Sequence, residues 1–407
     1  MKVEMITDSY QTAIDRLRQQ GFVKYADNGA QGLNGNVFTT TMTKEQLAVT
    51  VIHFVKTDVT YLVYEEDANL SKHLFNSEEY IAENKSGVKT TLHMLETYRP
   101  GSSFVLQLKN GHFILCDGSW PQELPYLIEH MEKLVPEGEV PIIEAWFITH
   151  PHSDHVSIFQ EFNSEKGYEK RLYVEGIYFD AFDDELAESM HFAPLQEGVR
   201  NAAKVLRTPQ GNITPVYRPH AGERYYFSDI TVDVMQTSVQ VPREKWYKWK
   251  DNLNEMSTWY MFTIEGQKYL NSGDADLGAM HEIMKTYDQK YLDMDIMAVQ
   301  HHGINVHDEF TDFIKVKTLL YPYFGVFGVF KEGLDWPGSW QASVSRNKYL
   351  HATVEEYMSY GDGTKILSFP YSVGESKTLP LRGERFKFEG LVKERRIDYG
   401  LGGVFSE

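Results

Sequence analysis

The stretch Ala-Trp-Phe-Ile-Thr-His-Pro-His-Ser-Asp-His, residues 145–155, is the most informative part of this sequence. Its apolar beginning is typical of a buried strand, and it ends in four side chains that bind metals, namely His150, His152, Asp154 and His155. Neutral imidazoles and a carboxylate suit zinc, manganese or iron. The His-x-His alternation directs the first pair to one side, and the following turn can bring the second pair towards a neighbouring point. The stretch predicts metal binding, with one ion at each pair as the natural division.

Length and composition indicate a large globular protein. At 407 residues the chain exceeds one ordinary core, so we expect two domains, or one large domain with an appendage. No apolar run approaches the length of a membrane span. The first residues lack the apolar core of a signal peptide, which predicts residence in the cytoplasm. The single cysteine, Cys116, excludes an internal disulfide framework and lies in an apolar strand, as an inert buried thiol would.

The net charge of −18 restricts the class of binding partner. A surface this acidic repels phosphate backbones, which argues against broad nucleic-acid binding and against binding to anionic membranes. A local basic pocket can still accept an anionic small molecule, and bound metal would reverse the sign of the charge at the site itself. We therefore expect a small-molecule substrate.

The first 90 residues have the pattern of a small α+β domain. Residues 9–20 have apolar side chains at helical spacing, with Asp8 or Ser9 as the cap and Gly21 as the stop. Polar breaks separate three strand-like runs, at residues 37–42, 47–55 and 60–64. A polar junction, with helical patterns at residues 78–84 and 92–98, leads to a second domain over residues 91–407. The first domain has no metal-like cluster, and an oligomerisation surface, a lid and a partner-binding module are all consistent with it; a homo-oligomer would form through this domain.

Acids and histidines follow three further apolar strands. A hairpin with an Asn-Gly turn ends in Asp117, and a second hairpin leads to Asp274. A strand over residues 295–300 ends in the pair His301 and His302. Because strand ends on one edge of a sheet converge, we expect these residues to lie near the histidine-rich stretch. The recurrence of such residues at strand ends, in this order, is a stronger signal than any one of them alone.

These residues resemble the motifs of the metallo-β-lactamase fold superfamily, and within it the branch of the hydrolase domain of the DNA-uptake protein ComEC. Residues 150–155 match the His-x-His-x-Asp-His signature, residues 272–274 are similar to a Thr-Gly-Asp motif, and residues 301–303 match a His-His-Gly motif. Residues 254–257 are similar to the Asn-x-x-Ser passage of the branch. The likeness extends over residues 91–388 and includes a helix before a final strand at residues 349–367. It implies an α/β fold, an αββα sandwich, preceded by the small N-terminal α+β domain.

The resemblance also implies two divalent metal ions, with zinc first and manganese or iron as alternatives. The implied ligands are His150 and His152 for the first ion, Asp154, His155 and one of the paired histidines for the second, and Asp274 as a bridge. We favour His301 because it comes first off the strand, which leaves His302 beside a ligand or facing the substrate; the reverse assignment stays open. Asp117 would accept the free N–H of a ligand imidazole, although a plain turn acid is the alternative.

The sequence departs from the family at three places. The usual Gly-Gly after the signature is replaced by Val156 and Ser157, and the acidic start of the first strand is replaced by residues 99–102. The third metal-binding histidine of β-lactamases and ribonuclease Z is not evident, as is usual in this branch. The first metal position is therefore the less certain of the two, and β-lactamase activity is not expected.

The chemistry that the family implies is hydrolysis. A metal ion lowers the pKa of its bound water to about 7 and so supplies hydroxide as the nucleophile. Asp154 and Asp274 would orient that hydroxide, His302 would act on the substrate side, and the metals would stabilise charge on a phosphoryl or acyl oxygen. We expect a phosphodiester or phosphomonoester-like bond as the target.

Two aromatic stretches flank the motifs. Their most prominent members are Trp246, Trp249 and Trp336, and Arg346 follows them. One interpretation is a pocket wall that stacks a base or cages a quaternary amine, with the arginine meeting a phosphate. The other is core and loop packing in a chain rich in tyrosine and tryptophan, with a solvated arginine.

Two alternative functions remain at the level of sequence. The first alternative is a nuclease, which the analogy with the uptake-protein relatives suggests and which the net charge of −18 opposes. A non-hydrolytic protein that senses a ligand or redox state through its metal site is the other. Electron transfer with a flavin partner, known among relatives, is disfavoured by the lack of a flavodoxin-like segment.

Overall fold

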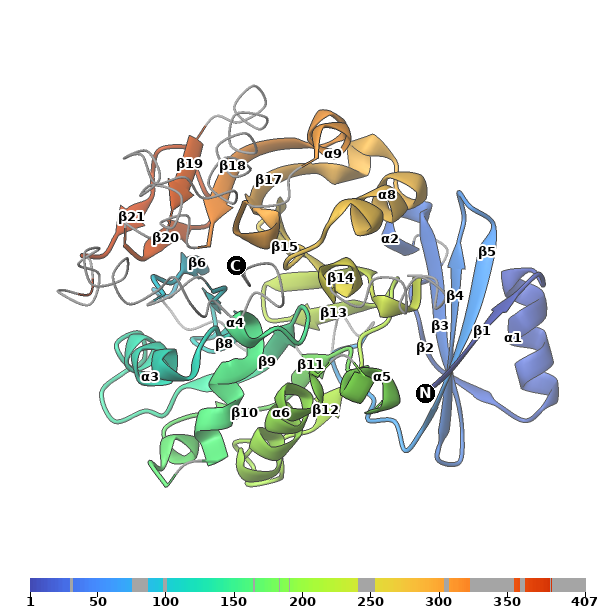
Figure 1. Cartoon of the computed structure of the whole chain (residues 1–407), viewed down its shortest axis with the longest axis horizontal. Coiled ribbons are helices and arrows are strands. Elements are labelled where there is room, and N and C mark those ends of the chain that lie inside the picture. The colour runs from blue at the N-terminus through green and yellow to red at the C-terminus, as the bar shows by residue number, and fades with distance from the viewer. Residues whose placement is uncertain are drawn as a thin grey trace.

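The computed structural model describes residues 1–29, 32–74, 87–97, 101–163, 165–182, 184–189, 191–240, 253–303, 307–322, 355–358, 363–380 and 382. Their strands form three sheets, one N-terminal and two central (Figure 1). Among the described residues, no helix is long and apolar enough to cross a membrane.

The N-terminal sheet is antiparallel, with the strand order β1-β5-β4-β3-β2. Its elements are β1 (Lys2–Ile6), α1 (Tyr10–Gln19), β2 (Val23–Asp27), α2 (Gly32–Gly35), β3 (Val37–Lys44), β4 (Leu47–Phe54) and β5 (Val59–Glu66). The predicted helix and three strands are confirmed, and Ser9 caps the helix by accepting a hydrogen bond from the Thr12 N–H. The two edge strands escaped prediction because their runs of five residues are short and have no clear alternation of buried and exposed side chains.

The first central sheet has the order β12-β11-β9-β8-β7-β6-β20-β21, with β10 beside β9. Its strands are β6 (Thr91–Met94), β7 (Phe104–Gln107), β8 (Phe113–Cys116), β9 (Ile142–Ile148), β10 (Tyr173–Val174), β11 (Ile177–Phe179), β12 (Val216–Tyr217), β20 (Lys365–Ser368) and β21 (Lys377–Thr378). The helix predicted over residues 92–98 is wrong, because Thr91–Met94 pairs with β7 in this sheet. Sheet pairing overrides a weak local helical pattern.

The second central sheet has the order β13-β14-β15-β16-β17-β18-β19. Its strands are β13 (Arg224–Phe227), β14 (Ile230–Gln236), β15 (Trp259–Ile264), β16 (Gln267–Asn271), β17 (Asp293–Ala298), β18 (Lys315–Tyr321) and β19 (Glu355–Met358). Residues 355–358 were expected within a helix, and this prediction is wrong because they pair with β18 in parallel.

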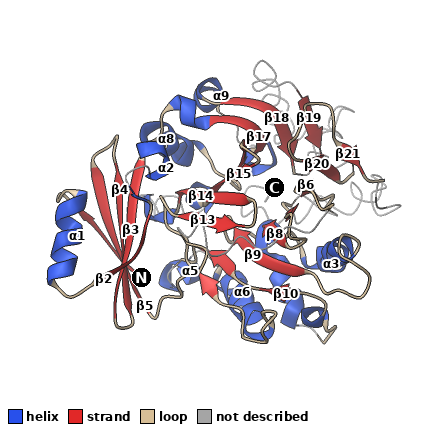
Figure 2. Cartoon of the chain, turned by 180° about the vertical axis from the view of Figure 1, so that it is seen from behind, coloured by secondary structure: helices blue, strands red, loops and turns tan. Residues whose placement is uncertain are grey.

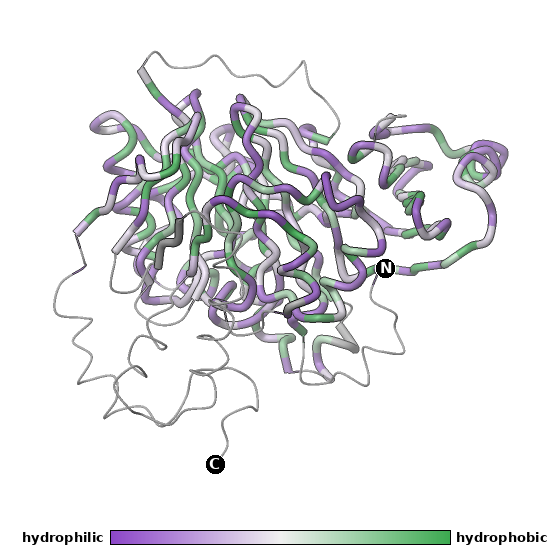
Figure 3. The backbone as a smooth tube through the Cα atoms, turned by 90° about the horizontal axis from the view of Figure 1, so that it is seen from above, coloured by the Kyte–Doolittle hydropathy of each residue, from purple (hydrophilic) through white to green (hydrophobic). Residues whose placement is uncertain are grey.

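The two central sheets pack face to face and are covered by helices on their outer sides (Figures 1 and 2). The helices outside the first sheet are α3 (Leu124–Glu132) and α6 (Ala193–Val205), and those outside the second are α8 (Leu277–Thr286) and α9 (Asp308–Phe313). The architecture is therefore the αββα sandwich that the sequence predicts. Figure 3 shows the hydrophobic stretches concentrated in the strands at the centre of the molecule.

Strand β9 illustrates why its sequence is apolar without alternation. Ala145 and Phe147 pack between the two central sheets, whereas Trp146 and Ile148 pack on the opposite side, beneath the helices. A strand buried on both faces needs apolar side chains at successive positions. The same strand carries the metal-binding sequence out to the edge of the sheet.

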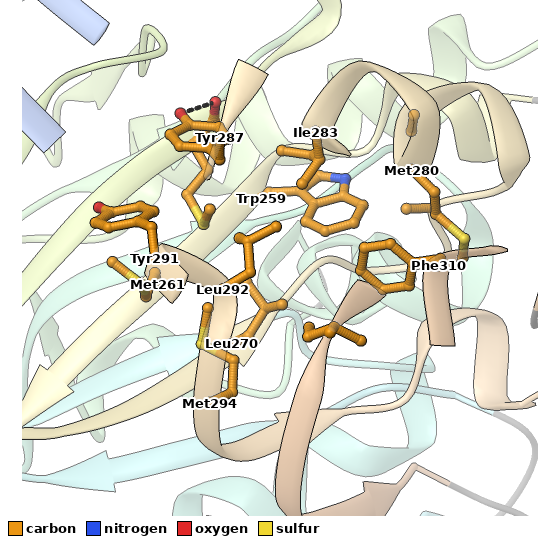
Figure 4. Packing of buried hydrophobic residues seen from close by; sticks show 14 of the residues in the cluster. Trp259, Met261, Leu270, Met280, Ile283, Tyr287, Tyr291, Leu292, Met294 and Phe310 are labelled. Atoms are coloured by element: carbon orange, nitrogen blue, oxygen red, sulfur yellow. Dashed lines mark hydrogen bonds between the residues drawn. The ribbon is translucent and has the colours of Figure 1, made fainter. Parts of the chain in front are cut away.

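The N-terminal sheet uses both of its faces. In β4, Val49 and Val51 pack against α1, whereas Ile52 and Phe54 lie in a core shared with β15 and α8. Figure 4 shows the α8 side of that core, where Trp259 meets Phe310 edge-on at 5.7 Å between ring centroids. One face of the sheet is thus occupied by the rest of the same chain. The boundary at residue 90 and a role in oligomerisation stay predictions.

A chain of buried charges also joins this sheet to the rest of the molecule. Arg218 contacts Asp180 at 2.6 Å and Glu65, the second-last residue of β5, at 2.8 Å. Glu65 in turn lies 2.8 Å from Nε2 of His220. These side chains are mostly buried, so each charge depends on its partners for stabilisation.

Candidate metal centre

The predicted residues lie where strands of both central sheets end. In the first sheet β8, β9 and β11 run parallel, and in the second sheet β16, β17 and β18 run parallel. Parallel neighbours place their carboxyl ends at one edge, where α/β proteins usually bind ligands. The two edges meet because the Thr258 N–H, just before β15, donates to the Thr149 carbonyl, just after β9, at 2.8 Å.

Among the described residues, two groups of possible metal ligands lie here. The larger group, which we term the second metal position, consists of Asp154, His155, Asp274 and His302. Nε2 of His155 lies 3.1 Å from Oδ1 of Asp274, and Nε2 of His302 lies 3.2 Å from Oδ2 of Asp154. All four side chains are at most 2% exposed. Two carboxylates and two imidazoles therefore converge in a space closed to water.

The far nitrogen of each imidazole in this position is held by a hydrogen bond. His155 donates its Nδ1–H to Oδ2 of Asp117 at 2.7 Å, and His302 donates its Nδ1–H to the Pro322 carbonyl at 2.8 Å. In the neutral form of each ring, this pattern leaves the lone pair of Nε2 free, as ligation requires. Asp117 thus makes the contact that the sequence predicts for it, and it is further held by the Thr149 N–H at 2.9 Å.

The other group consists of His150, His152 and Asp274, which we term the first metal position. Nε2 of His150 lies 2.9 Å from Nδ1 of His152 and 3.8 Å from Oδ2 of Asp274. Asp274 is shared by both positions, which is the geometry of a bridging carboxylate. The His-x-His alternation therefore does bring its two rings to one point.

The electrostatics of the second position favour positive charge. Burial opposes protonation of His155, but the carboxylates around it, Asp274 first, raise its pKa well above the usual value. The pKa of His302 is raised for the same reason, against its burial. Burial would raise the pKa of Asp274, yet His155 and His302 hold it well below the usual range. A strongly negative local field of this kind attracts cations.

The imidazoles of the first position are kept neutral. Burial holds the pKa of His150 well below its usual value, and the neighbouring imidazoles lower it further. Burial lowers the pKa of His152 to about 4. Neutral imidazoles are the form that binds a metal ion at physiological pH.

The residues present fit divalent metal ions. Within the described part of the chain, Nε2 of His155 and Oδ2 of Asp274 are buried and have no hydrogen-bond partner, and both face the shared space. Two buried carboxylates, Asp154 and Asp274, line that space, and a third, Asp117, lies behind the His155 ring. Buried polar atoms and charges normally find partners, and a cation would satisfy all of these at once.

The histidine pair at the end of β17 is divided by the structure. His302 belongs to the second position, whereas His301, which the sequence favoured as a ligand there, lies outside both groups of described residues. Nε2 of His301 is 3.7 Å from Oδ2 of Asp274, and its Nδ1 is 3.3 Å from Nδ2 of Asn254. The order of residues along a strand does not predict which ring turns inward.

Two residues of the predicted motifs, Thr149 and Gly273, support the centre in ways that the sequence did not predict. Thr149 holds Asp117 through its N–H and hydroxyl, and Gly273 has φ +55° with so little space that an added Cβ would lie 2.6 Å from Cβ of Thr149. The Ser-Gly-Asp motif therefore needs its glycine for this close approach. The predicted substrate contacts lie outside the described residues; they are Trp246, Trp249, Trp336 and Arg346.

Comparison with known proteins gives similar structures at low identity. No family model matches the sequence, and no curated protein matches it. The metallo-β-lactamase fold protein YhfI from Bacillus subtilis is 12% identical, with 66% of this chain and 95% of that chain covered and a TM-score of 0.36. Zinc-bound PqqB from Methylobacterium extorquens is 12% identical, with 65% and 86% covered and a TM-score of 0.39. A long form RNase Z from yeast is 10% identical, with 75% and 52% covered and a TM-score of 0.39.

Proposed function

We propose that this chain is a metal-dependent hydrolase of the metallo-β-lactamase fold superfamily, related to the ComEC-like branch, and that it cleaves a phosphoester bond in a small molecule. The observation that carries the proposal is the pair of buried ligand groups that share Asp274. One group offers two imidazoles and the other offers two imidazoles and a carboxylate besides the shared one. Such paired positions suit displacement reactions in which attacking and leaving oxygens are both stabilised.

The ligands that we assign follow the geometry rather than the order of residues. His150, His152 and Asp274 would hold an ion at the first position, and Asp154, His155, Asp274 and His302 an ion at the second. Zinc fits this mixture of imidazole and carboxylate, with manganese or iron as alternatives. When bound, such ions supply Lewis acidity and lower the pKa of a water molecule to about 7.

The residues of the chain have distinct tasks in this proposal. The carboxylates of Asp154 and Asp274 line the space between the positions and can accept a proton from the attacking water. Asp117 keeps the His155 ring in the tautomer that presents Nε2. The Pro322 carbonyl does the same for His302. Burial of all these groups excludes bulk water and strengthens their electrostatic effect on the substrate.

The substrate class follows from charge and from the resemblance. A net charge of −18 disfavours a long polyanion, so a small phosphoester is proposed ahead of a nucleic acid. A nuclease would have to concentrate positive charge near the centre to overcome this repulsion. Binding of labelled single-stranded DNA, followed by fluorescence, tests that alternative directly.

The decisive experiment joins metal analysis with turnover. The purified protein should contain divalent metal and hydrolyse bis-p-nitrophenyl phosphate or p-nitrophenyl phosphate, whereas Asp274→Ala should lose both the metal and the turnover. A control is Asp295→Ala. Asp295 lies in the first half of β17, away from the histidine pair that follows this strand, and its carboxylate accepts a hydrogen bond from the Lys268 N–H at 2.9 Å. Full activity in Asp274→Ala would refute the assignment, and metal without hydrolysis of any phosphate or carboxylic ester would favour a binding or sensing protein.

A further inference from the structure

The two histidines at the end of β17 adopt an unusual backbone conformation. His301 has φ 47° and ψ 47°, and His302 has φ 54° and ψ 19°. A non-glycine residue in this left-handed region costs about 1–3 kcal/mol, and such strain is concentrated at functional sites. Two such residues in succession turn the chain sharply, so that the adjacent rings diverge, with centroids 6.1 Å apart and planes at 61°. An extended strand would have pointed the two imidazoles to opposite faces of the sheet, whereas this conformation directs both of them towards Asp274.

Nε2 of each ring lies 3.7 Å from Oδ2 of Asp274, but the two rings differ in their other neighbours. His302 reaches Asp154 at 3.2 Å and belongs to the second position. Nε2 of His301 lies 3.7 Å from Oδ2 of Asp274, the same oxygen that lies 3.8 Å from Nε2 of His150. Ligand atoms arranged tetrahedrally around zinc at 2.0–2.1 Å lie about 3.3 Å apart. His301 therefore stands close to ligand spacing from the oxygen that it shares with His150, in the position that has three ligand residues rather than four.

We propose that the histidine pair is divided between the two metal positions, so that His301 supplies the third imidazole of the position held by His150 and His152, with Asn254 as the residue that positions it. This inference rests on the metal-dependent function proposed above. The sequence lacks the separate third histidine of β-lactamases, and here the first member of the pair takes its place. His301 is 12% exposed at its side chain, so it can turn towards the ion without disturbing the core.

Asn254 is arranged to select the tautomer of His301. Its amide group lies 3.3 Å from Nδ1 of His301, and its Oδ1 is buried without a partner among the described residues. A half-turn of the amide brings that oxygen to Nδ1, where it can accept the imidazole N–H. Nε2 then carries a free lone pair towards Asp274, as a metal ligand requires. The arrangement parallels the contact of Asp117 with His155, with a neutral acceptor in place of a carboxylate.

The segment that carries Asn254 is fixed to the same part of the molecule as Asp274. It forms a short 3-10 helix, η6 (Leu253–Met256), in which the buried carboxylate of Glu255 accepts hydrogen bonds from the Gly278 N–H at 3.0 Å and the Ala279 N–H at 2.6 Å. These donors are at the beginning of α8, just beyond Asp274. Hydrogen bonds therefore join the segment of the positioning residue to the start of α8, a few residues after the shared carboxylate.

Counting the metal ions that the full chain binds tests whether His301 and His302 serve different metal positions. Zinc bound after equilibrium dialysis would be measured by mass spectrometry, and cobalt-substituted protein by its visible absorption. The wild-type chain should bind two ions, and His301→Ala should weaken one of them by more than the roughly 10–100-fold loss that follows removal of an outer partner. Adding His301→Ala to His150→Ala should remove no further ion, whereas adding it to His302→Ala should remove the second. His281→Ala, a surface histidine of α8 paired with Glu309, is the control and should bind two ions.

Asn254 variants test how the histidine is positioned. Asn254→Ala should weaken the first position by about 10–100-fold. Asn254→Asp, which can only accept, should restore the affinity; if it binds as poorly as the alanine variant, the amide donates to Nδ1 and the positioning role is refuted. Wild-type affinity for two ions in His301→Ala would refute the ligand role. These measurements of metal binding do not need turnover. A chain that binds two ions but hydrolyses no ester would refute the proposed function, whereas the assignment of His301 and His302 to different metal positions could still be tested.

Discussion

Replacing Asp117 by asparagine perturbs the centre without removing a ligand. The Asp117 carboxylate is fully buried and accepts the Nδ1–H of His155 at 2.7 Å and the Thr149 N–H at 2.9 Å. Asparagine has the same shape, and its oxygen can still accept from Thr149. Its NH₂ group then faces Nδ1 of His155, where two donors cannot form a hydrogen bond.

The imidazole must respond by exchanging its proton between its nitrogens. Nδ1 would accept from the new amide, and Nε2 would carry the proton in the direction of Asp274, 3.1 Å away. A protonated Nε2 has no lone pair for a metal ion. We expect the affinity of the second position to fall about 10–100-fold, which is about 1.4–2.7 kcal/mol, and turnover to fall with it.

The assay is competition for zinc with a coloured chelator, followed by phosphoester hydrolysis at saturating metal. Glu144→Gln provides a matched control, because Glu144 is likewise a buried acid beside an imidazole, 2.8 Å from Nδ1 of His112, but stands near the start of β9, whereas the centre follows the end of that strand. The control should keep wild-type affinity for both ions. If Asp117→Asn also binds both ions as tightly as the wild-type chain, the tautomer argument is refuted.

Two further predictions concern stability. Arg218→Ala removes the ion-pair partner of the buried Asp180 carboxylate and leaves Glu65 with His220 alone, so the free energy of unfolding in urea should fall by about 3–5 kcal/mol. An unchanged urea midpoint would contradict the buried charge chain. Burial lowers the pKa of His130 to about 4, and it lies 2.8 Å from His93, so both imidazoles fold in the neutral form. The pKa of His130 in the folded chain lies below its unfolded value of about 6.5, so the stability that comes from folding with a neutral imidazole is present above pH 6.5 and is lost as the pH falls towards 4, by about 3 kcal/mol for His130 alone. Urea titrations at pH 7 and pH 4.5 should show this loss of stability, and His130→Gln should show a smaller loss.

The local sequence was sufficient to predict most of the residues of the centre, and the resemblance of its motifs to a known fold superfamily implied the sandwich. A strand and the ligands at its end are contiguous in the chain, so an apolar run followed by His-Pro-His-Ser-Asp-His identifies both together. The N-terminal α+β unit could be predicted for the same reason, from the spacing of Ile14 and Leu17 on α1 and from the continuous strand-forming run of β4 between polar breaks. These features depend on periodicity and on neighbouring residues, which a single sequence contains.

Long-range pairing was harder to predict. Residues 91–94 and 355–358 have weak local patterns, and each became a strand because a neighbouring strand offered hydrogen bonds. The edge strands β1 and β2 depend in the same way on β5 and β3. Where local preference is weak, the partner across the sheet sets the conformation.

The division of labour between His301 and His302 came from the folded chain alone. Both follow the same strand, and their order suggested the opposite assignment. Their left-handed backbone turns one ring to Asp154 and the other towards Asn254, residues more than 45 positions away. The sequence could name the metal-binding side chains because their chemistry is local, whereas their grouping into two positions depends on distances between strand ends, which exist only after both sheets have packed.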